Sequence, residues 1–219
     1  MRLIACVAAA LGLAMAGPAL AGEGGPGMSY APRDECRSDP GAAAFLDQLG
    51  EAVEKRDVDA LVALAAPDIH LDFGGGEGRD ELRDRFVNGG EYYGDLWKEF
   101  SIVLSLGCAS EGDGMIALPW YFTQDFGDAD VFSTMLAVGP DVKVRASAAD
   151  DARVIASLNW STVEVPGDYD FESKFTEVEL PGMKRGYVET GKLRSLIDYR
   201  LVAERTDEGW QITAFIAGD

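Results

Sequence analysis

Apolar and polar residues alternate in short runs between Val142 and Leu193. Turn residues separate the runs, which cover 142–145, 154–158, 162–165, 175–180 and 186–188. Successive side chains of a β-strand point to opposite faces, so each run predicts a half-buried strand. Together the runs predict a small closed barrel whose apolar positions all face one interior.

A helical period governs the first half of the chain. One face of a helix that begins at Pro40 collects the apolar residues Phe45, Leu46, Leu49 and Val53. Asp57 predicts the N-cap of a second, short helix over 58–65, which a proline ends. Two more helices are expected over 79–87 and 95–106.

Further strands are expected around these helices. The run over 68–73 alternates, with Ile69, Leu71 and Phe73 on one side, and a glycine-rich turn follows it. Another strand is expected over 115–122. Strands over 198–204 and 210–216, joined by a turn, predict a closing hairpin.

The order of helix, short helix, strand, glycine turn and helix resembles the opening of the nuclear-transport-factor-2-like cone fold. This group includes ketosteroid-isomerase-like and polyketide-cyclase-like proteins, and the closing hairpin resembles the end of the same fold. The resemblance implies a curved antiparallel sheet packed on helices. It also implies a pocket between them, with an ionisable residue in apolar surroundings.

Residues 142–193 resemble a bacterial Src-homology-3-type domain. The resemblance rests on V-K-V-R at 142–145, V-I-A-S-L at 154–158, V-E-V at 163–165 and G-Y-V at 186–188. Phe175 stands where this family often has tryptophan. Because such domains are often found in envelope proteins, the resemblance implies peptidoglycan or an envelope protein as partner.

The predicted fold class is α+β, with a helical N-terminal half, a cone-like curved antiparallel sheet and an inserted small all-β barrel of Src-homology-3 type. The predicted divisions are a signal peptide over 1–21, a leader over 22–39, a cone-like domain over 40–125 with 194–219, and the barrel over 131–193. The leader is expected to be flexible unless Cys36 is bonded.

The first residues resemble a bacterial export signal. Arg2 supplies a charged start, an apolar stretch covers 3–15, and Ala19-Leu20-Ala21 forms a small-residue cleavage site. The apolar stretch is too short to span a bilayer, and no other segment approaches about 20 apolar residues. We therefore expect a periplasmic or secreted protein with no membrane span after cleavage.

The formal net charge of −19 and the pI of about 4.3 exclude nucleic acid as a partner, because such a field repels phosphate backbones. Signal cleavage would remove Cys6 and leave Cys36 and Cys108. An oxidising compartment favours a disulfide between these two, and the alternative is a pair of buried free thiols.

The sequence offers no convincing nucleophile, metal or cofactor motif, so no catalytic residue is assigned. The glycines after the first strand lack the Lys-Ser/Thr pair of a phosphate loop. Asp125, Asp128 and Asp130 lack the residue order of a calcium loop, and one histidine with two cysteines is too few for zinc. No metal or cofactor is expected.

Four residues would be candidates if the cone pocket were catalytic: His70, Asp72, Tyr121 and Asp198. His70, the only histidine, lies on the polar side of its strand and fits either a surface residue or an acid–base group. A ligand role is predicted instead for Trp160, Tyr169 and Tyr187, with core packing as the alternative.

The leading hypothesis is an exported, non-catalytic binding module that contacts cell-wall material or an envelope protein through the small barrel. One alternative is a small-molecule isomerase, cyclase or dehydratase that uses the cone pocket. The other is a structural subunit of an envelope assembly.

Overall fold

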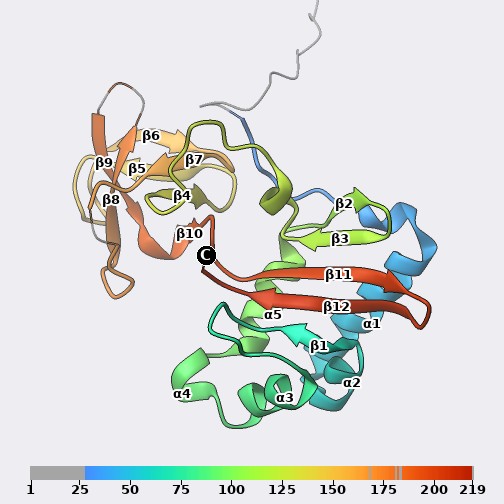
Figure 1. Ribbon diagram of the computed structural model, residues 1–219. Helices are drawn as coiled ribbons and strands as arrows, with labels where there is room; N and C mark the ends of the chain where they lie inside the picture. Colours follow the sequence, from blue (N-terminus) through green and yellow to red (C-terminus); the bar gives the residue numbers. More distant parts are fainter. Residues whose placement is uncertain (1–27, 168, 181, 183, 219) are drawn as a thin grey trace, which may run out of the picture.

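The computed structural model describes residues 28–218 except 168, 181 and 183. The predicted signal peptide lies outside these residues. The described residues form two β-sheets, and helices cover one face of the first (Figure 1). The chain is therefore α+β, as the sequence predicts.

The first sheet has five strands, in the order β1 (Ala65–His70), β12 (Gly209–Ile216), β11 (Arg200–Thr206), β3 (Met115–Leu118) and β2 (Ala109–Gly112). β1 runs parallel to β12, and the other neighbours are antiparallel. Its helices are α1 (Pro40–Lys55), α2 (Val58–Ala63), α3 (Arg79–Val87), α4 (Gly90–Tyr93) and α5 (Leu96–Ser105).

Aspartates begin three of these helices, because a side-chain carboxylate can accept from backbone N–H groups that lack a partner within the helix. Asp39 accepts from the N–H groups of Gly41 and Ala42 at the start of α1. Asp57 caps α2 as expected, and Asp95 does the same for α5.

The core of this half lies between α1, α5 and the inner face of the sheet. Fully buried side chains fill it, among them Leu49, Leu61, Ile69, Phe100, Leu201, Ile212 and Phe215. Phe100 and Phe215 stack with ring centroids 3.8 Å apart. The space between helices and sheet is thus packed with apolar side chains.

The second sheet has seven strands, in the order β10 (Leu193–Ser195), β4 (Thr134–Ala137), β7 (Thr162–Glu164), β8 (Phe175–Leu180), β9 (Lys184–Glu189), β5 (Val142–Arg145) and β6 (Val154–Leu158). Its interior holds Val144, Val178 and Val188, each fully buried. The predicted strands over 142–145, 154–158 and 175–180 are confirmed residue for residue.

Closure of this sheet into a barrel is not shown. Among the described residues the ladder leaves β10 and β6 as edges. The Src-homology-3-type identity of this part stays a prediction, and so do the domain boundaries.

Two strand predictions need correction. The strand expected over 115–122 ends at Leu118, because Pro119 has no N–H to continue the ladder, and Trp120–Thr123 form a 3₁₀ turn, η2. The strand expected over 68–73 is β1, which starts earlier and ends at His70. Phe73 lies beyond it and is 59% exposed rather than buried.

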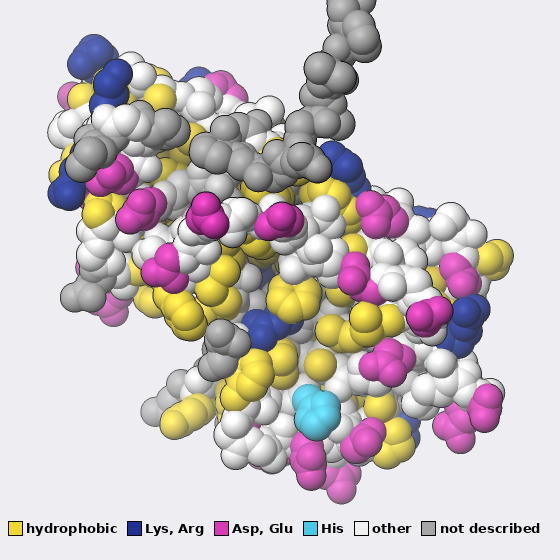
Figure 2. Space-filling model, turned by 45° about the horizontal axis from the view of Figure 1, so that its top comes forward, with side chains coloured by type: hydrophobic (Ala, Val, Ile, Leu, Met, Phe, Trp, Pro, Cys, Tyr) yellow, Lys and Arg dark blue, Asp and Glu magenta, His cyan; other side chains and the backbone are white. Residues whose placement is uncertain are grey.

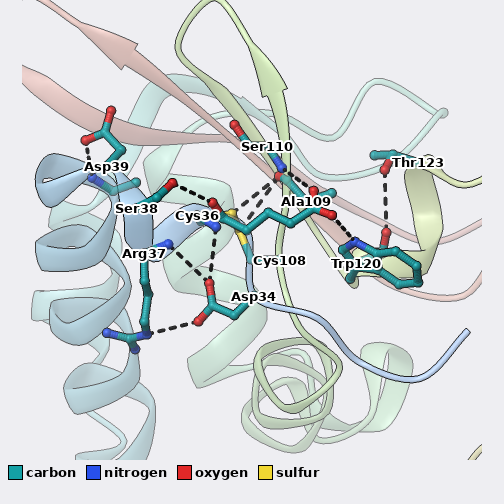
Figure 3. Close-up of a disulfide and its surroundings, with 12 residues drawn as sticks. Asp34, Cys36, Arg37, Ser38, Asp39, Cys108, Ala109, Ser110, Trp120 and Thr123 are labelled. Atoms are coloured by element: carbon teal, nitrogen blue, oxygen red, sulfur yellow. Dashed lines mark hydrogen bonds and ion pairs between the residues drawn. A yellow bond between two sulfur atoms is a disulfide. The ribbon is translucent and has the colours of Figure 1, made fainter.

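A disulfide joins Cys36, in the short 3₁₀ turn η1 (Cys36–Ser38), to Cys108 just before β2 (Figure 3). The Cα atoms are 5.8 Å apart, so the predicted pairing is confirmed in the structure. Gly107 allows this approach, since it has a φ of +84° and any Cβ there would lie 2.2 Å from the Arg33 carbonyl oxygen.

The predicted leader is packed where it is described. Tyr30 is buried, Asp34 forms a parallel bridge with Cys108, and Glu35 accepts from Trp120 Nε1 at 2.8 Å (Figure 3). With Cys36 bonded, these contacts hold residues 28–39 against the body of the fold.

Candidate functional site

A cleft of about 820 Å³ opens between α5 and the second sheet. Figure 2 shows hydrophobic side chains gathered where the two halves of the molecule meet. The walls include α5, the loop and strand around Thr190 and Leu193, the residues just before β11, and the loop that carries Tyr169 and Phe171. The cleft thus combines groups that are far apart in the sequence.

A buried arginine forms the base of this cleft. Arg194 is 7% exposed, and its Nε donates to the Tyr121 hydroxyl at 3.0 Å. Nη2 donates to the Tyr199 carbonyl oxygen at 3.0 Å. Nη1 lies 3.0 Å from an Asp198 carboxylate oxygen and 3.8 Å from one of Glu99. The guanidinium is therefore held by contacts within the protein.

The ionisable groups around Arg194 have altered pKa values. Burial raises the pKa of Glu99, the charge of Asp198 raises it further, and Arg194 opposes both effects. Burial also raises the pKa of the Tyr121, Tyr169 and Tyr199 hydroxyls. The three phenols are thus neutral hydrogen-bonding groups at ordinary pH.

Aromatic rings link the cleft to the core on one side and to solvent on the other. Tyr199 stacks on Phe215 with ring centroids 4.8 Å apart. Tyr169 meets Phe171 edge to face at 4.5 Å, and Phe171 is 81% exposed at the rim.

Two of the four catalytic candidates come together. Tyr121 and Asp198 both contact Arg194, through the hydrogen bond and ion pair described above. His70 is exposed, bridges to Glu77, and is not among the residues that line the cleft. His70 is the cyan side chain in Figure 2.

Asp72 has a different role, as the closing group of the glycine turn. Its carboxylate accepts from the N–H groups of Gly74 and Gly76 and pairs with Arg85. The Gly76 N–H and then the Arg85 side chain lower the pKa of Asp72 to about 2. The glycine run is therefore a strand-to-helix turn, which agrees with the preferred interpretation of the sequence.

The three predicted ligand residues lie apart. Tyr169 lines the cleft, and its hydroxyl donates to the Thr190 carbonyl oxygen at 3.4 Å. Trp160 packs beside the cluster of Tyr30 and Leu136. Tyr187 lies on the outer side of β9, with its hydroxyl 3.4 Å from Glu177.

Glu99 and Arg194 are not among the candidates that the sequence patterns indicate. Glu99 lies three residues after Leu96 and four before Val103, which are both buried. This spacing indicates that Glu99 lies at the edge of the apolar face of the helix. Arg194 stands between Leu193 and Ser195 with no local sign of its burial. Its partners come from positions up to 95 residues away, as the 3.8 Å contact with Glu99 shows.

Among the described residues no helix has the length and apolarity to cross a bilayer. Nor does this part of the chain contain a group of three or more His, Cys, Asp or Glu residues that could hold a metal ion.

No family model matches the chain, and no curated protein matches it either. The solved structures to which it is similar include an NTF2-like protein with a cystatin-like fold from Novosphingobium aromaticivorans, at 12% identity, 83% coverage of this chain and 80% of that one, and a TM-score of 0.28. An NTF-2-like protein of unknown function from Shewanella oneidensis has 12% identity, coverages of 82% and 98%, and a TM-score of 0.30. A domain of unknown function with a cystatin-like fold from Nostoc punctiforme has 14% identity, coverages of 82% and 75%, and a TM-score of 0.30. The structural neighbours are thus NTF2-like or cystatin-like, and superpositions this loose say nothing about activity.

Proposed function

We propose that the protein is a non-catalytic binding protein that holds a small molecule in the cleft between α5 and the second sheet. The observation that supports this most is the fixed Arg194 network at the base of a cleft of about 820 Å³. Ligand sites in proteins are typically about 300–1,000 Å³, largely apolar, with a few well-placed polar groups.

The walls fit that description. The apolar lining comes from Ile102 and Leu106 of the α5 region, from Val138, which packs in the same cluster, and from Leu193 of β10. The polar groups are few and are positioned by the protein, since each Arg194 nitrogen already contacts a protein oxygen. Such a site needs little reorganisation to bind a ligand.

A matched pair of bulky variants tests the proposal. Ser105 lines the cleft on α5 and is exposed, so Ser105→Trp fills the site without removing a core side chain. Ser101 is exposed on the same helix but does not line the cleft, which makes Ser101→Trp the control.

The measurement is a ligand-observed NMR screen of small fragments against the wild type and both variants. We expect fragments that bind the wild type and Ser101→Trp and are lost from Ser105→Trp. Fragments that bind all three proteins equally, or no binding at all, would refute a site in this cleft.

Acid–base catalysis in the same cleft is a second candidate function. The observation in its favour is the Glu99 carboxyl, whose pKa is raised by burial as general acids and bases require. Proton–deuterium exchange at carbon, followed by NMR on small ketones, tests it. No exchange above the rate with Glu99→Gln would exclude this candidate.

Export and a cell-envelope partner are part of the proposal. The resemblance of residues 142–193 to Src-homology-3-type domains and the disulfide between Cys36 and Cys108 support them. Pull-down on cell-wall sacculi, at low and high salt, tests the partner. No retention and no co-purified envelope protein would count against it.

A further inference from the structure

We infer that the ligand of the cleft is an organic ammonium ion: a protonated amine at the Glu99–Asp198 end with an apolar body along Ile102 and Leu193. This inference rests on the proposed binding function and specifies its ligand class. Three features of the cleft support it: its charge balance, an unsatisfied carboxylate and its aromatic walls.

The base of the cleft carries an excess negative charge. Glu99 and Asp198 contribute two carboxylates, and Arg194 is the guanidinium that contacts both. At the rim, the exposed Lys98 and Asp95 also line the cleft, and Asp95 forms an ion pair with Arg56 at 3.5 Å. Because excess charge is costly in a half-buried site, the arrangement favours a cation or a proton as its occupant.

Glu99 lacks the hydrogen bonds that a half-buried carboxylate needs. Its side chain is 20% exposed, and no hydrogen bond from the described residues reaches it. Arg194 Nη1 stays 3.8 Å away, beyond hydrogen-bonding distance. Asp198 differs, since it accepts from the Tyr199 N–H at 2.7 Å. An ammonium N–H would supply the donor that Glu99 lacks.

The walls suit a cation with an apolar body. The rings of Tyr169, Phe171 and Tyr199 line the cleft, and aromatic faces attract ammonium groups. Ile102 and Leu193 offer apolar surface beside them. The net charge of −19 also raises the local concentration of cations and opposes anions.

Three probes with the same apolar body separate charge from shape: 2-phenylethylamine, 2-phenylethanol and phenylacetate. Their affinities are measured by calorimetry at pH 7 and low salt. We expect the amine to bind at least about tenfold more tightly than the alcohol, because a charged hydrogen bond adds that much. Phenylacetate is expected not to bind.

Two variants test whether Glu99 causes the preference for the amine over the alcohol. Glu99→Gln keeps the shape and removes the charge, so we expect a loss of about tenfold in amine affinity with the alcohol unchanged. Glu54→Gln is the control, since Glu54 is exposed on α1, does not line the cleft, and loses the same charge. Melting curves check that both variants fold.

Equal binding of amine and alcohol would overturn the inference while leaving a cleft ligand in place. Binding of neither probe would overturn it too, and the separate fragment screen then decides whether the cleft binds anything. If Glu54→Gln weakens amine binding as much as Glu99→Gln does, the preference arises from the overall charge and the assignment to the cleft is wrong.

Discussion

The Asp72 carboxylate shows how one side chain can make part of the fold sensitive to acid. It holds the turn between β1 and α3 through two backbone N–H groups and Arg85. These contacts lower its pKa from 3.8 to about 2. The folded state thus binds a proton at this site less readily than the unfolded chain does.

The lowered pKa of Asp72 makes the free energy of unfolding decrease at low pH. Stability from Asp72 is fully present above about pH 4 and is lost as the pH falls through about 2. We expect Asp72→Asn to melt below the wild type at pH 6, and this gap in melting temperature to narrow towards pH 2.

Asp207→Asn, in the exposed turn between β11 and β12, controls for the loss of one charge. The assignment would be contradicted if the gap between Asp72→Asn and the wild type stayed constant over this pH range.

The alternating faces of β9 allow a second prediction. Val188 is fully buried in the second core, whereas Tyr187 is half-buried on the other side. Val188→Ala should cost about 1–3 kcal/mol through lost transfer energy and a cavity, and Tyr187→Ala should cost less. Denaturant unfolding of the two variants measures this, and equal losses would speak against it.

In β9 the sequence pattern was informative. The alternation in G-Y-V predicts that Tyr187 and Val188 point to opposite faces, and the burial of Val188 shows which one is inward. Gly186 allows close packing, since a Cβ there would lie 2.4 Å from Val144 Cγ1. The cleft could not be predicted in the same way. Glu99, Arg194 and Asp198 meet only through tertiary packing, and no local period encodes that contact.

Among the elements, those with strong periods were the most predictable. α3 and the strands β5, β6 and β8 have the expected bounds. Short elements were missed, among them α4, β4 and β10, because three or four residues show too little of a period. The early end of β1 has a local cause. The apolar–polar alternation continues to Phe73 in the sequence, but Asp72 already forms the turn with Gly74 and Gly76.

The disulfide between η1 and the start of β2 allows a prediction about how these elements stabilise the fold. The disulfide closes a loop between residues 72 apart in sequence, so it should stabilise the fold by about 4 kcal/mol on the chain-entropy model. Guanidinium unfolding of oxidised wild type and the Cys36→Ser, Cys108→Ser double variant measures the difference. A difference under about 1 kcal/mol would mean that the other contacts of residues 28–39 suffice.

At the scale of the whole molecule, the chain passes from the first sheet to the second after β3 and comes back to the first sheet at β11. These strands pair directly, with Leu118 opposite Leu201, although the second sheet lies between them in sequence. Replacing the intervening residues with a two-residue Asn-Gly turn would convert β3 and β11 into a hairpin. This change tests the predicted division into two domains.

We expect the shortened protein to fold with the five-stranded sheet intact, at lower stability because Leu106 and Ala109 lose partners of the Tyr30 cluster. Amide chemical-shift dispersion in NMR spectra is the measurement. A collapsed spectrum, with full-length protein well dispersed under the same conditions, would show that the two sheets fold as one unit.

The position of β12 has a consequence for the order in which the molecule can form. This strand lies between β1 and β11, so it joins the first strand of the described chain to the rest of its sheet. All strands of the second sheet lie within residues 134–195, before β11 and β12. During synthesis, which proceeds from the N-terminus, the strands of the second sheet can therefore pair before β12 exists. β1 stays without its partner strand until more than a hundred further residues have been made.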